Sequence, residues 1–158
     1  MAKILVAYYS RTGNTEKMAQ AIAEGAKEAG HEVELKKVND VKPSSLLDYD
    51  GYVFGSPVYY GLPAAPLVEL FDESVILHKR LSGRVGGAFA SSGNTGGGNE
   101  TTCMAILQMM LVHGMLAVGS AEGDHYGPVA VGSPDSRALA QCKALGKRVA
   151  DFAAKVKN

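Results

Sequence analysis

The stretch Ser10-Arg11-Thr12-Gly13-Asn14-Thr15 has the residue types that bind a phosphate group. It follows an apolar run and precedes a segment with helical spacing, so we expect it at a helix N-terminus. Backbone N–H groups and the positive end of the helix dipole favour an anion there. The alternative is an ordinary strand-to-helix turn whose hydroxyl groups only cap the helix. The loop is not a Walker A motif, since no GK[ST] follows, and it is not a GxGxxG dinucleotide turn.

A second group follows a later strand-like run and consists of Pro57, Val58, Tyr59, Tyr60 and Gly61. Two adjacent tyrosines at the carboxyl end of a strand can place one ring against a planar cofactor. The alternative is a tyrosine pair that packs on the surface of the domain. Because a phosphate loop precedes it in the chain, we favour the cofactor interpretation.

A third group is the glycine-rich segment Ser91-Ser92-Gly93-Asn94-Thr95-Gly96-Gly97-Gly98. So many glycines expose backbone N–H and C=O groups, which can hydrogen-bond the edge of a flat heterocycle. The alternative is a flexible linker. A linker between a buried strand and its crossover helix would be unusual, because such connections are short in compact domains.

The elements around these groups alternate between strands and helices. We predict strands at 4–9, 32–38, 51–55, 84–90 and 115–118. We predict a first helix that contains Met18 to Ala26 and stops at Gly30, and further helices at 63–76, 101–112 and 133–156. The segment 119–132 is glycine-rich and predicted to be irregular. The last helix is predicted to begin at Ser133-Pro134-Asp135-Ser136, with the proline at its first position.

This alternation predicts an α/β fold. We expect one domain over residues 1–158, a three-layer sandwich around a five-stranded parallel sheet in the order 2-1-3-4-5. The three glycine- and hydroxyl-rich groups then lie at the carboxyl ends of strands. In open α/β sheets ligands bind at that edge.

The composition excludes some classes of function. The chain has 158 residues with 16 basic and 16 acidic side chains, so no basic excess is available for nucleic-acid binding. Cys103 and Cys142 belong to no CxxC motif or metal-ligand cluster, which predicts no metal site and a reduced, cytoplasmic protein. No signal peptide or apolar run long enough to cross a bilayer is visible, so we expect no membrane insertion.

The first loop resembles the FMN phosphate loop of flavodoxins. Other stretches resemble the flavodoxin-like NAD(P)H:quinone oxidoreductases known as WrbA, and the two resemblances together cover essentially the whole chain. Those stretches are Gly55-Ser56-Pro57, the third group, Val112-His113-Gly114-Met115, and the segment from Tyr126-Gly127 to Ser136-Arg137.

The resemblance implies an FMN-binding redox protein. The first expectation is an oxidoreductase that takes hydride from NAD(P)H and passes electrons to quinone-like acceptors. In that case His113 would lie near the flavin and donate a hydrogen bond or move a proton. The alternative for His113 is a half-buried histidine that ends a helix. The alternative function is a flavodoxin-type electron carrier between redox proteins, without a substrate of its own.

Two departures from these families affect the expectations. The chain is shorter than typical quinone reductases of this group, and it contains no tryptophan. One face of the flavin would therefore be open, or covered by another subunit of a homo-oligomer.

Neither flavin-facing loop contains a carboxylate before Glu100, so the two-electron reduced state is expected to be accessible. The polar residues Asp124, His125 and Tyr126 are assigned to a surface loop.

Overall fold

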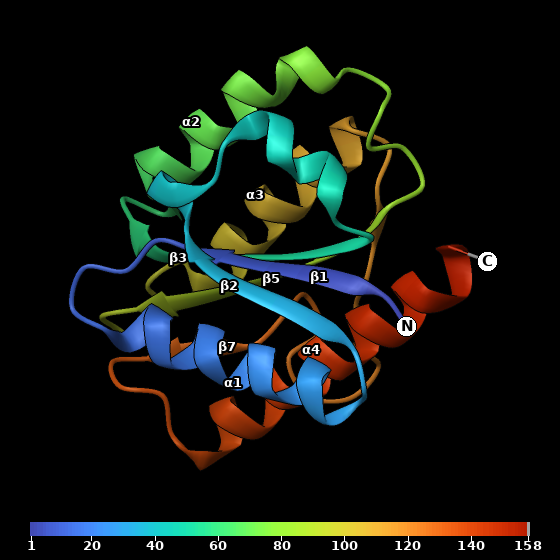
Figure 1. Cartoon of the computed structure of the whole chain (residues 1–158). Coiled ribbons are helices and arrows are strands. Elements are labelled where there is room, and N and C mark those ends of the chain that lie inside the picture. Colours follow the sequence, from blue (N-terminus) through green and yellow to red (C-terminus); the bar gives the residue numbers. More distant parts are fainter. Residues whose placement is uncertain (158) are drawn as a thin grey trace.

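The computed structural model describes residues 1–157 and has helices on both faces of a sheet (Figure 1). The strands are β1 (Lys3–Tyr8), β2 (Glu32–Lys37), β3 (Gly51–Tyr59), β4 (Leu62–Pro63), β5 (Val85–Ser92), β6 (Leu116–Ala117) and β7 (Val129–Val131). The helices are α1 (Asn14–Glu28), α2 (Ala65–Glu73), α3 (Asn99–Val112) and α4 (Ser136–Lys157), with short 3-10 turns at 38–40, 43–48 and 74–77. Among the described residues, no helix is long and apolar enough to span a membrane.

The sheet has the order β2-β1-β3-β5-β6, and these neighbours pair in parallel. This confirms the predicted fold class and strand order. The fifth position is shared by two short strands, because β6 pairs with the start of β5 and β7 pairs with its end. The segment 119–132, predicted to be irregular throughout, therefore contains one strand of the sheet.

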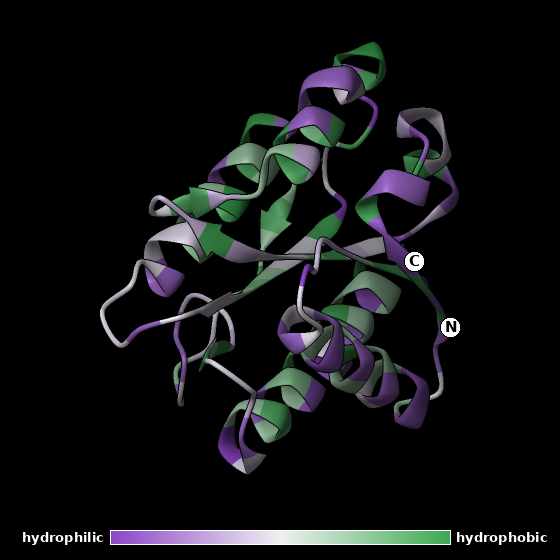
Figure 2. Cartoon of the chain, turned by 90° about the vertical axis from the view of Figure 1, so that its left-hand side faces the viewer, coloured by the Kyte–Doolittle hydropathy of each residue, from purple (hydrophilic) through white to green (hydrophobic). Residues whose placement is uncertain are grey.

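The central strands β1, β3 and β5 are buried on both faces of the sheet, which explains their continuous apolar sequences. From β1, Ile4 and Val6 pack into one core with α1 and α4, whereas Leu5 and Ala7 pack into a second core with α2 and α3. Figure 2 shows the two helical layers on either side of the sheet, with hydrophilic residues along their outer sides.

Helices α1 and α4 pack closely because glycines face the partner backbone. A Cβ atom on Gly25 would lie 2.1 Å from the Lys143 carbonyl oxygen, and one on Gly146 would lie 1.9 Å from the Ile22 carbonyl oxygen. Neither contact is sterically possible. The two glycines therefore set the distance between these helices, and α1 is the helix that follows the first loop.

Several boundaries differ from those predicted, and two of these differences have a clear structural reason. Strand β3 continues past Gly55 to Tyr59, because it forms an antiparallel hairpin with β4. Helix α4 begins at Ser136 rather than with Pro134 at its first position. Asp135 precedes the helix, and its Oδ1 accepts a hydrogen bond from the Ala138 N–H at 2.8 Å, which caps the first turn.

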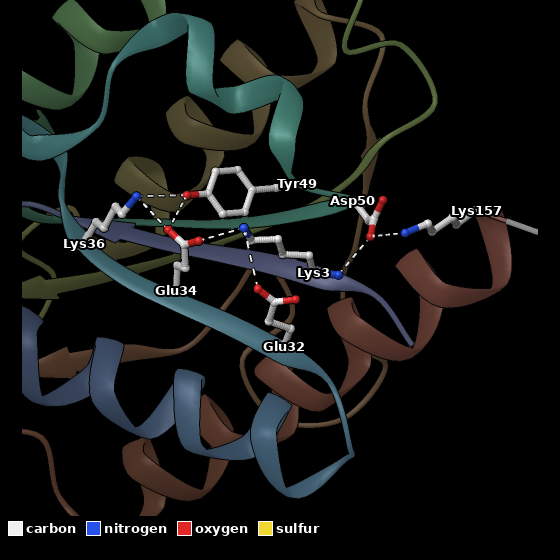
Figure 3. A network of polar contacts seen from close by, with 7 residues as sticks. All are labelled: Lys3, Glu32, Glu34, Lys36, Tyr49, Asp50 and Lys157. Atoms are coloured by element: carbon white, nitrogen blue, oxygen red, sulfur yellow. Dashed lines mark hydrogen bonds and ion pairs between the residues drawn. The ribbon is translucent and has the colours of Figure 1, made fainter.

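The edge strand β2 carries a network of charged side chains (Figure 3). The Glu34 carboxylate accepts from Lys3 Nζ at 2.8 Å, Lys36 Nζ at 2.6 Å and Tyr49 OH at 2.6 Å. These three partners lower the pKa of Glu34 to about 2. Charged side chains on an edge strand disfavour pairing with another chain, and Tyr49 ties the edge to the loop before β3.

Candidate functional site

The carboxyl ends of β1, β3 and β5 surround a pocket of about 310 Å³. All three predicted groups of residues contribute to its wall. The lining residues are Ser10, Arg11, Thr12, Asn14, Thr15, Pro57, Val58, Tyr59, Ser91, Ser92, Gly93 and Gly132. The tertiary structure thus brings segments that are distant in the sequence to the edge at which open α/β sheets bind ligands.

The first loop is organised by Ser10. Its Oγ accepts hydrogen bonds from the N–H groups of Gly13 at 3.1 Å and Glu16 at 3.3 Å. Gly13, the N-cap of α1, has a left-handed backbone (φ 98°) and no side chain of its own to make this cap. The N–H groups of Asn14 and Thr15, in the first helical turn, have no intrahelical acceptor. They are available to an anion in the pocket.

A buried hydrogen bond joins the first and third groups. Thr15 Oγ1 lies 2.8 Å from Ser91 Oγ, and both residues are almost fully buried. Because each hydroxyl has one proton and only one is used between them, the other remains free to donate. The pair therefore holds the two loops together and still leaves one donor on the pocket wall.

The two tyrosines of the second group have different surroundings. Tyr59, the last residue of β3, lines the pocket, and its ring contacts that of Tyr9 edge-on with centroids 6.3 Å apart. Tyr60 lies in the hairpin turn and is fully exposed. Tyr59 is therefore the tyrosine of this group that lines the pocket.

The third group is a turn held by its own side chains. Ser92 Oγ donates to the Asn94 carbonyl at 2.9 Å and accepts from Asn99 Nδ2 at 2.9 Å. Gly98, the N-cap of α3, approaches the hairpin, since a Cβ atom there would lie 3.1 Å from Gly61 Cα. A glycine at this position lets the third group pack against the second.

Seven of the predicted binding residues do not line this pocket: Gly13, Tyr60, Gly61, Asn94, Thr95, Gly96 and Gly97. Thr95 and Gly96 border a neighbouring hollow of about 420 Å³ together with Val131 and the first turn of α3. Gly13 and Gly61 have left-handed backbones (φ 98° and 79°), a conformation that favours glycine in these turns. That these seven residues contact a bound cofactor remains a prediction.

Sequence reasoning missed Gly132 as a wall residue. It follows β7, and its N–H donates to the Ser92 carbonyl at 2.8 Å. Its backbone is left-handed (φ 67°), which favours glycine. The resemblance of the segment from Tyr126 to Arg137 to the last loop of the WrbA group was the signal that could have identified it.

The pocket wall carries no carboxylate among the described residues that line it, and Arg11 gives it a positive charge. Glu16, in the first turn of α1, is turned to Tyr8, whose OH donates to Glu16 Oε1 at 2.6 Å. Burial, followed by this hydrogen bond, raises the pKa of Tyr8 to about 12. The electrostatic environment therefore favours an anionic ligand.

Within this chain, the structure does not place His113 beside these loops. Helix α3 starts at the carboxyl end of β5 and returns the chain to Leu116, which pairs with Val85 at the start of β5. His113 ends that helix, so about 21 Å of helix separates it from the third group. His113 lies near the amino-terminal ends of the strands, opposite to the pocket, because a crossover helix must return the chain to the beginning of the next parallel strand.

The surroundings of His113 agree with the alternative of a half-buried histidine at a helix end. Its Nε2 lies 2.7 Å from Ser74 Oγ. Ser74 gives its own proton to the Phe71 carbonyl at 2.6 Å, so Nε2 is assigned as the donor. Burial, and then the nearby His78, lower the pKa of His113. A catalytic role for His113 is a prediction that its position in this chain does not support.

No group of three or more His, Cys, Asp or Glu side chains in the described part of the chain is arranged to hold a metal ion. Cys103 and Cys142 are both buried free thiols. Burial raises the pKa of both thiols, that of Cys142 to about 12. Neither cysteine has the character of a reactive thiolate.

Comparisons with known proteins agree with this geometry. The sequence model of the family described as flavodoxin matches residues 6–106. A protein of Aquifex aeolicus named flavodoxin is 41% identical over 163 residues, covering 98% of this chain and 88% of that protein. A protein of Archaeoglobus fulgidus named NAD(P)H dehydrogenase (quinone) is 34% identical over 190 residues, covering 99% of this chain and all of that protein.

Solved structures give the same result. A flavodoxin from the domain Archaea superposes with a TM-score of 0.81 and 29% identity, covering 99% of both chains. A WrbA-like flavodoxin from Agrobacterium tumefaciens superposes with a TM-score of 0.83 and 25% identity, covering 98% of this chain and 99% of the other.

Proposed function

Because this chain belongs to the flavodoxin family, we propose that it binds FMN and passes electrons from NAD(P)H to quinone-like acceptors. The observation that carries the proposal is the pocket at the carboxyl ends of β1, β3 and β5, which joins a phosphate-type loop, a tyrosine and a glycine-rich loop. An open α/β sheet binds its ligand at this edge, and the family implies that the ligand is a flavin.

The residues present fit FMN. The pocket volume of about 310 Å³ is in the range of small-molecule sites. The phosphate would be held by the hydroxyl groups of Ser10 and Thr12, the free N–H groups at the start of α1, and the charge of Arg11. Tyr59 would contact one face of the ring system, and the backbone around Gly93 would meet its polar edge.

When bound, FMN would supply the hydride and electron transfer. The residues of this chain bind it, orient it and set its electrostatic environment. The absence of a carboxylate among the described lining residues avoids repulsion of an anionic reduced cofactor. Tyr60 is turned to solvent and does not line the pocket.

The first test is the absorption spectrum of the purified protein, where we expect the bands of a bound flavin. The second is steady-state oxidation of NADPH and NADH with benzoquinone as the acceptor, where we expect turnover that requires both FMN and quinone. Protein that takes up no FMN would contradict the cofactor. FMN-loaded protein without turnover would contradict the enzymatic activity.

An electron carrier is the second candidate function, and one specific observation favours it. The relative named flavodoxin is 41% identical, whereas the alignment with the quinone reductase spans 190 positions against the 158 residues of this chain. The quinone reductase therefore has inserted residues that this chain lacks. A carrier would show a long-lived one-electron-reduced state in a dithionite titration and no quinone turnover.

A further inference from the structure

Asp124 and Arg137 form an ion pair that we call the clasp. It links the segment before β7 to the first turn of α4. Arg137 Nη1 donates to Asp124 Oδ1 at 2.9 Å and to Oδ2 at 3.0 Å. The Asp124 side chain is 18% exposed, and that of Arg137 is 52% exposed. The clasp therefore lies at the surface but is partly covered on its acidic side.

Both members of the clasp also bind the backbone of one residue, Val129, in β7. The Val129 N–H donates to Asp124 Oδ2 at 2.9 Å, and Arg137 Nη2 donates to the Val129 carbonyl at 2.9 Å. An exposed ion pair by itself contributes little to stability. Here each charge instead makes a charge-assisted hydrogen bond to a main-chain group, which is a stronger and more directional contact.

The clasp occupies the side of β7 that β5 leaves free. On the β5 side, the Ala90 N–H donates to the Pro128 carbonyl at 3.1 Å, and the Gly132 N–H donates to the Ser92 carbonyl at 2.8 Å. Since alternate residues of a strand point their main-chain groups to opposite sides, those of Val129 point outward. The clasp satisfies them as a neighbouring strand would.

A strand of only three residues needs this second support, and its position matters for the pocket. Strand β7 (Val129–Val131) ends immediately before Gly132, which lines the pocket beside Ser92 and Gly93. We propose that the clasp of Asp124 and Arg137 is a positioning pair for the flavin site, because it holds β7 in register against β5 and thereby holds Gly132 on the pocket wall. The flavin itself rests on the proposed function.

The test compares FMN dissociation constants, measured by fluorescence quenching, for Asp124→Ala, Arg137→Ala and the double variant. We expect each single variant to bind FMN about tenfold more weakly, and the double variant to be no weaker than the worse single variant, since the two residues act as one unit. The matched control is Lys147→Ala. Lys147 also makes an exposed ion pair from α4, to Asp151 at 2.9 Å, and its loss should change FMN binding less than about twofold.

Two further readouts separate positioning from general destabilisation. At saturating FMN, the visible circular dichroism of the clasp variants should differ from that of the wild type, and that of Lys147→Ala should not. Arg137→Lys keeps the charge but lacks the planar fork, so we expect it to fold and to bind FMN several-fold more weakly. If an alanine variant fails to fold, Arg137→Lys replaces it in the comparison of FMN affinities. Wild-type FMN affinity and dichroism in all folded clasp variants would overturn the inference.

Hydrogen exchange of the protein without FMN tests the clasp independently of the cofactor. In the clasp variants, the amides of Ala130 and Gly132 should exchange faster, and those of β1 should not. Wild-type exchange at Gly132 would overturn the inference even if FMN binding changed. A wild-type protein that binds no FMN would contradict the proposed function instead, and the exchange result would then decide by itself whether the clasp holds Gly132.

Discussion

Tyr60 has a left-handed backbone (φ 52°) although it carries a Cβ atom, and its side chain is fully exposed. Such a conformation costs about 1–2 kcal/mol in a non-glycine residue, which exceeds the entropic cost of about 0.4–1 kcal/mol for introducing glycine. We expect Tyr60→Gly to raise the free energy of unfolding by roughly 0.5–1 kcal/mol, measured by urea denaturation.

The same variant tests which tyrosine faces the cofactor. FMN affinity should stay within about twofold in Tyr60→Gly and fall in Tyr59→Ala, because only Tyr59 lines the pocket. The matched control is Lys79→Gly, since Lys79 is the other non-glycine residue among residues 1–157 with a left-handed backbone (φ 67°). It should stabilise the protein similarly without any effect on FMN. A large loss of FMN affinity in Tyr60→Gly would show that Tyr60 contacts the cofactor after all.

The hydrogen bond between Thr15 and Ser91 gives a second prediction at this scale. Ser91→Ala leaves the buried Thr15 hydroxyl without its partner, which should cost about 1–3 kcal/mol of unfolding free energy in the protein without FMN. In the double variant Thr15→Val/Ser91→Ala, both partners are absent, so its loss should be smaller than the sum of the two single losses. Additive losses in urea denaturation would contradict a direct interaction between the two hydroxyl groups.

At the scale of elements, the contact between α1 and α4 depends on glycines. Helix propensity alone predicts that Gly146→Ala stabilises the protein by about 1 kcal/mol. The structure predicts the opposite sign, because the new Cβ atom would lie 1.9 Å from the Ile22 carbonyl oxygen. We expect a loss of about 1–3 kcal/mol, measured as a lower midpoint of urea unfolding. An increase in stability would contradict the close approach of the two helices.

The hairpin of β3 and β4 and the strand β7 are the elements that shape the pocket most directly. Both are short, and both depend on contacts with other parts of the chain. Gly98 lets the hairpin pack against the start of α3, and the clasp supports β7. The site is thus built on short elements that are attached to the rigid central strands.

At the scale of the whole molecule, the network on β2 makes stability depend on pH (Figure 3). The pKa of Glu34 is lowered from 4.5 to about 2 by Lys3, Lys36 and Tyr49. A carboxyl group whose pKa is lower in the folded state stabilises the protein above its unfolded pKa. This contribution is complete above pH 4.5 and is lost as the pH falls towards 2.

We therefore expect Glu34→Gln to reduce the unfolding free energy at pH 7 and to flatten its decline between pH 4.5 and 2. The control is Glu32→Gln, because the Glu32 side chain is 55% exposed and its ion pair with Lys3 has the longer distance of 3.5 Å. That variant should keep the wild-type dependence on pH. An unchanged acid profile in Glu34→Gln would contradict a structural role for the network.

Much of this protein can be predicted from the sequence. The continuous apolar runs, such as that at β1, predict buried parallel strands, and the hydroxyl and glycine residues after them predict ligand loops. These signals are local, because a strand, a turn or a helix start depends mainly on neighbouring residues. The alternation of these elements predicted the strand order, and eleven of the residues that line the pocket were found from the loops. The family followed from the resemblance of these motifs to flavodoxins.

Only the tertiary structure decided which residues of the loops face the pocket and which residues support them. Tyr59 faces inward and Tyr60 outward because β3 continues into a hairpin with β4. His113 lies at the far edge of the sheet because α3 must return the chain to the start of β6. Gly132 reaches the wall because Asp124 and Arg137 bind β7. Each of these outcomes depends on contacts between segments distant in sequence, which local residue patterns do not specify.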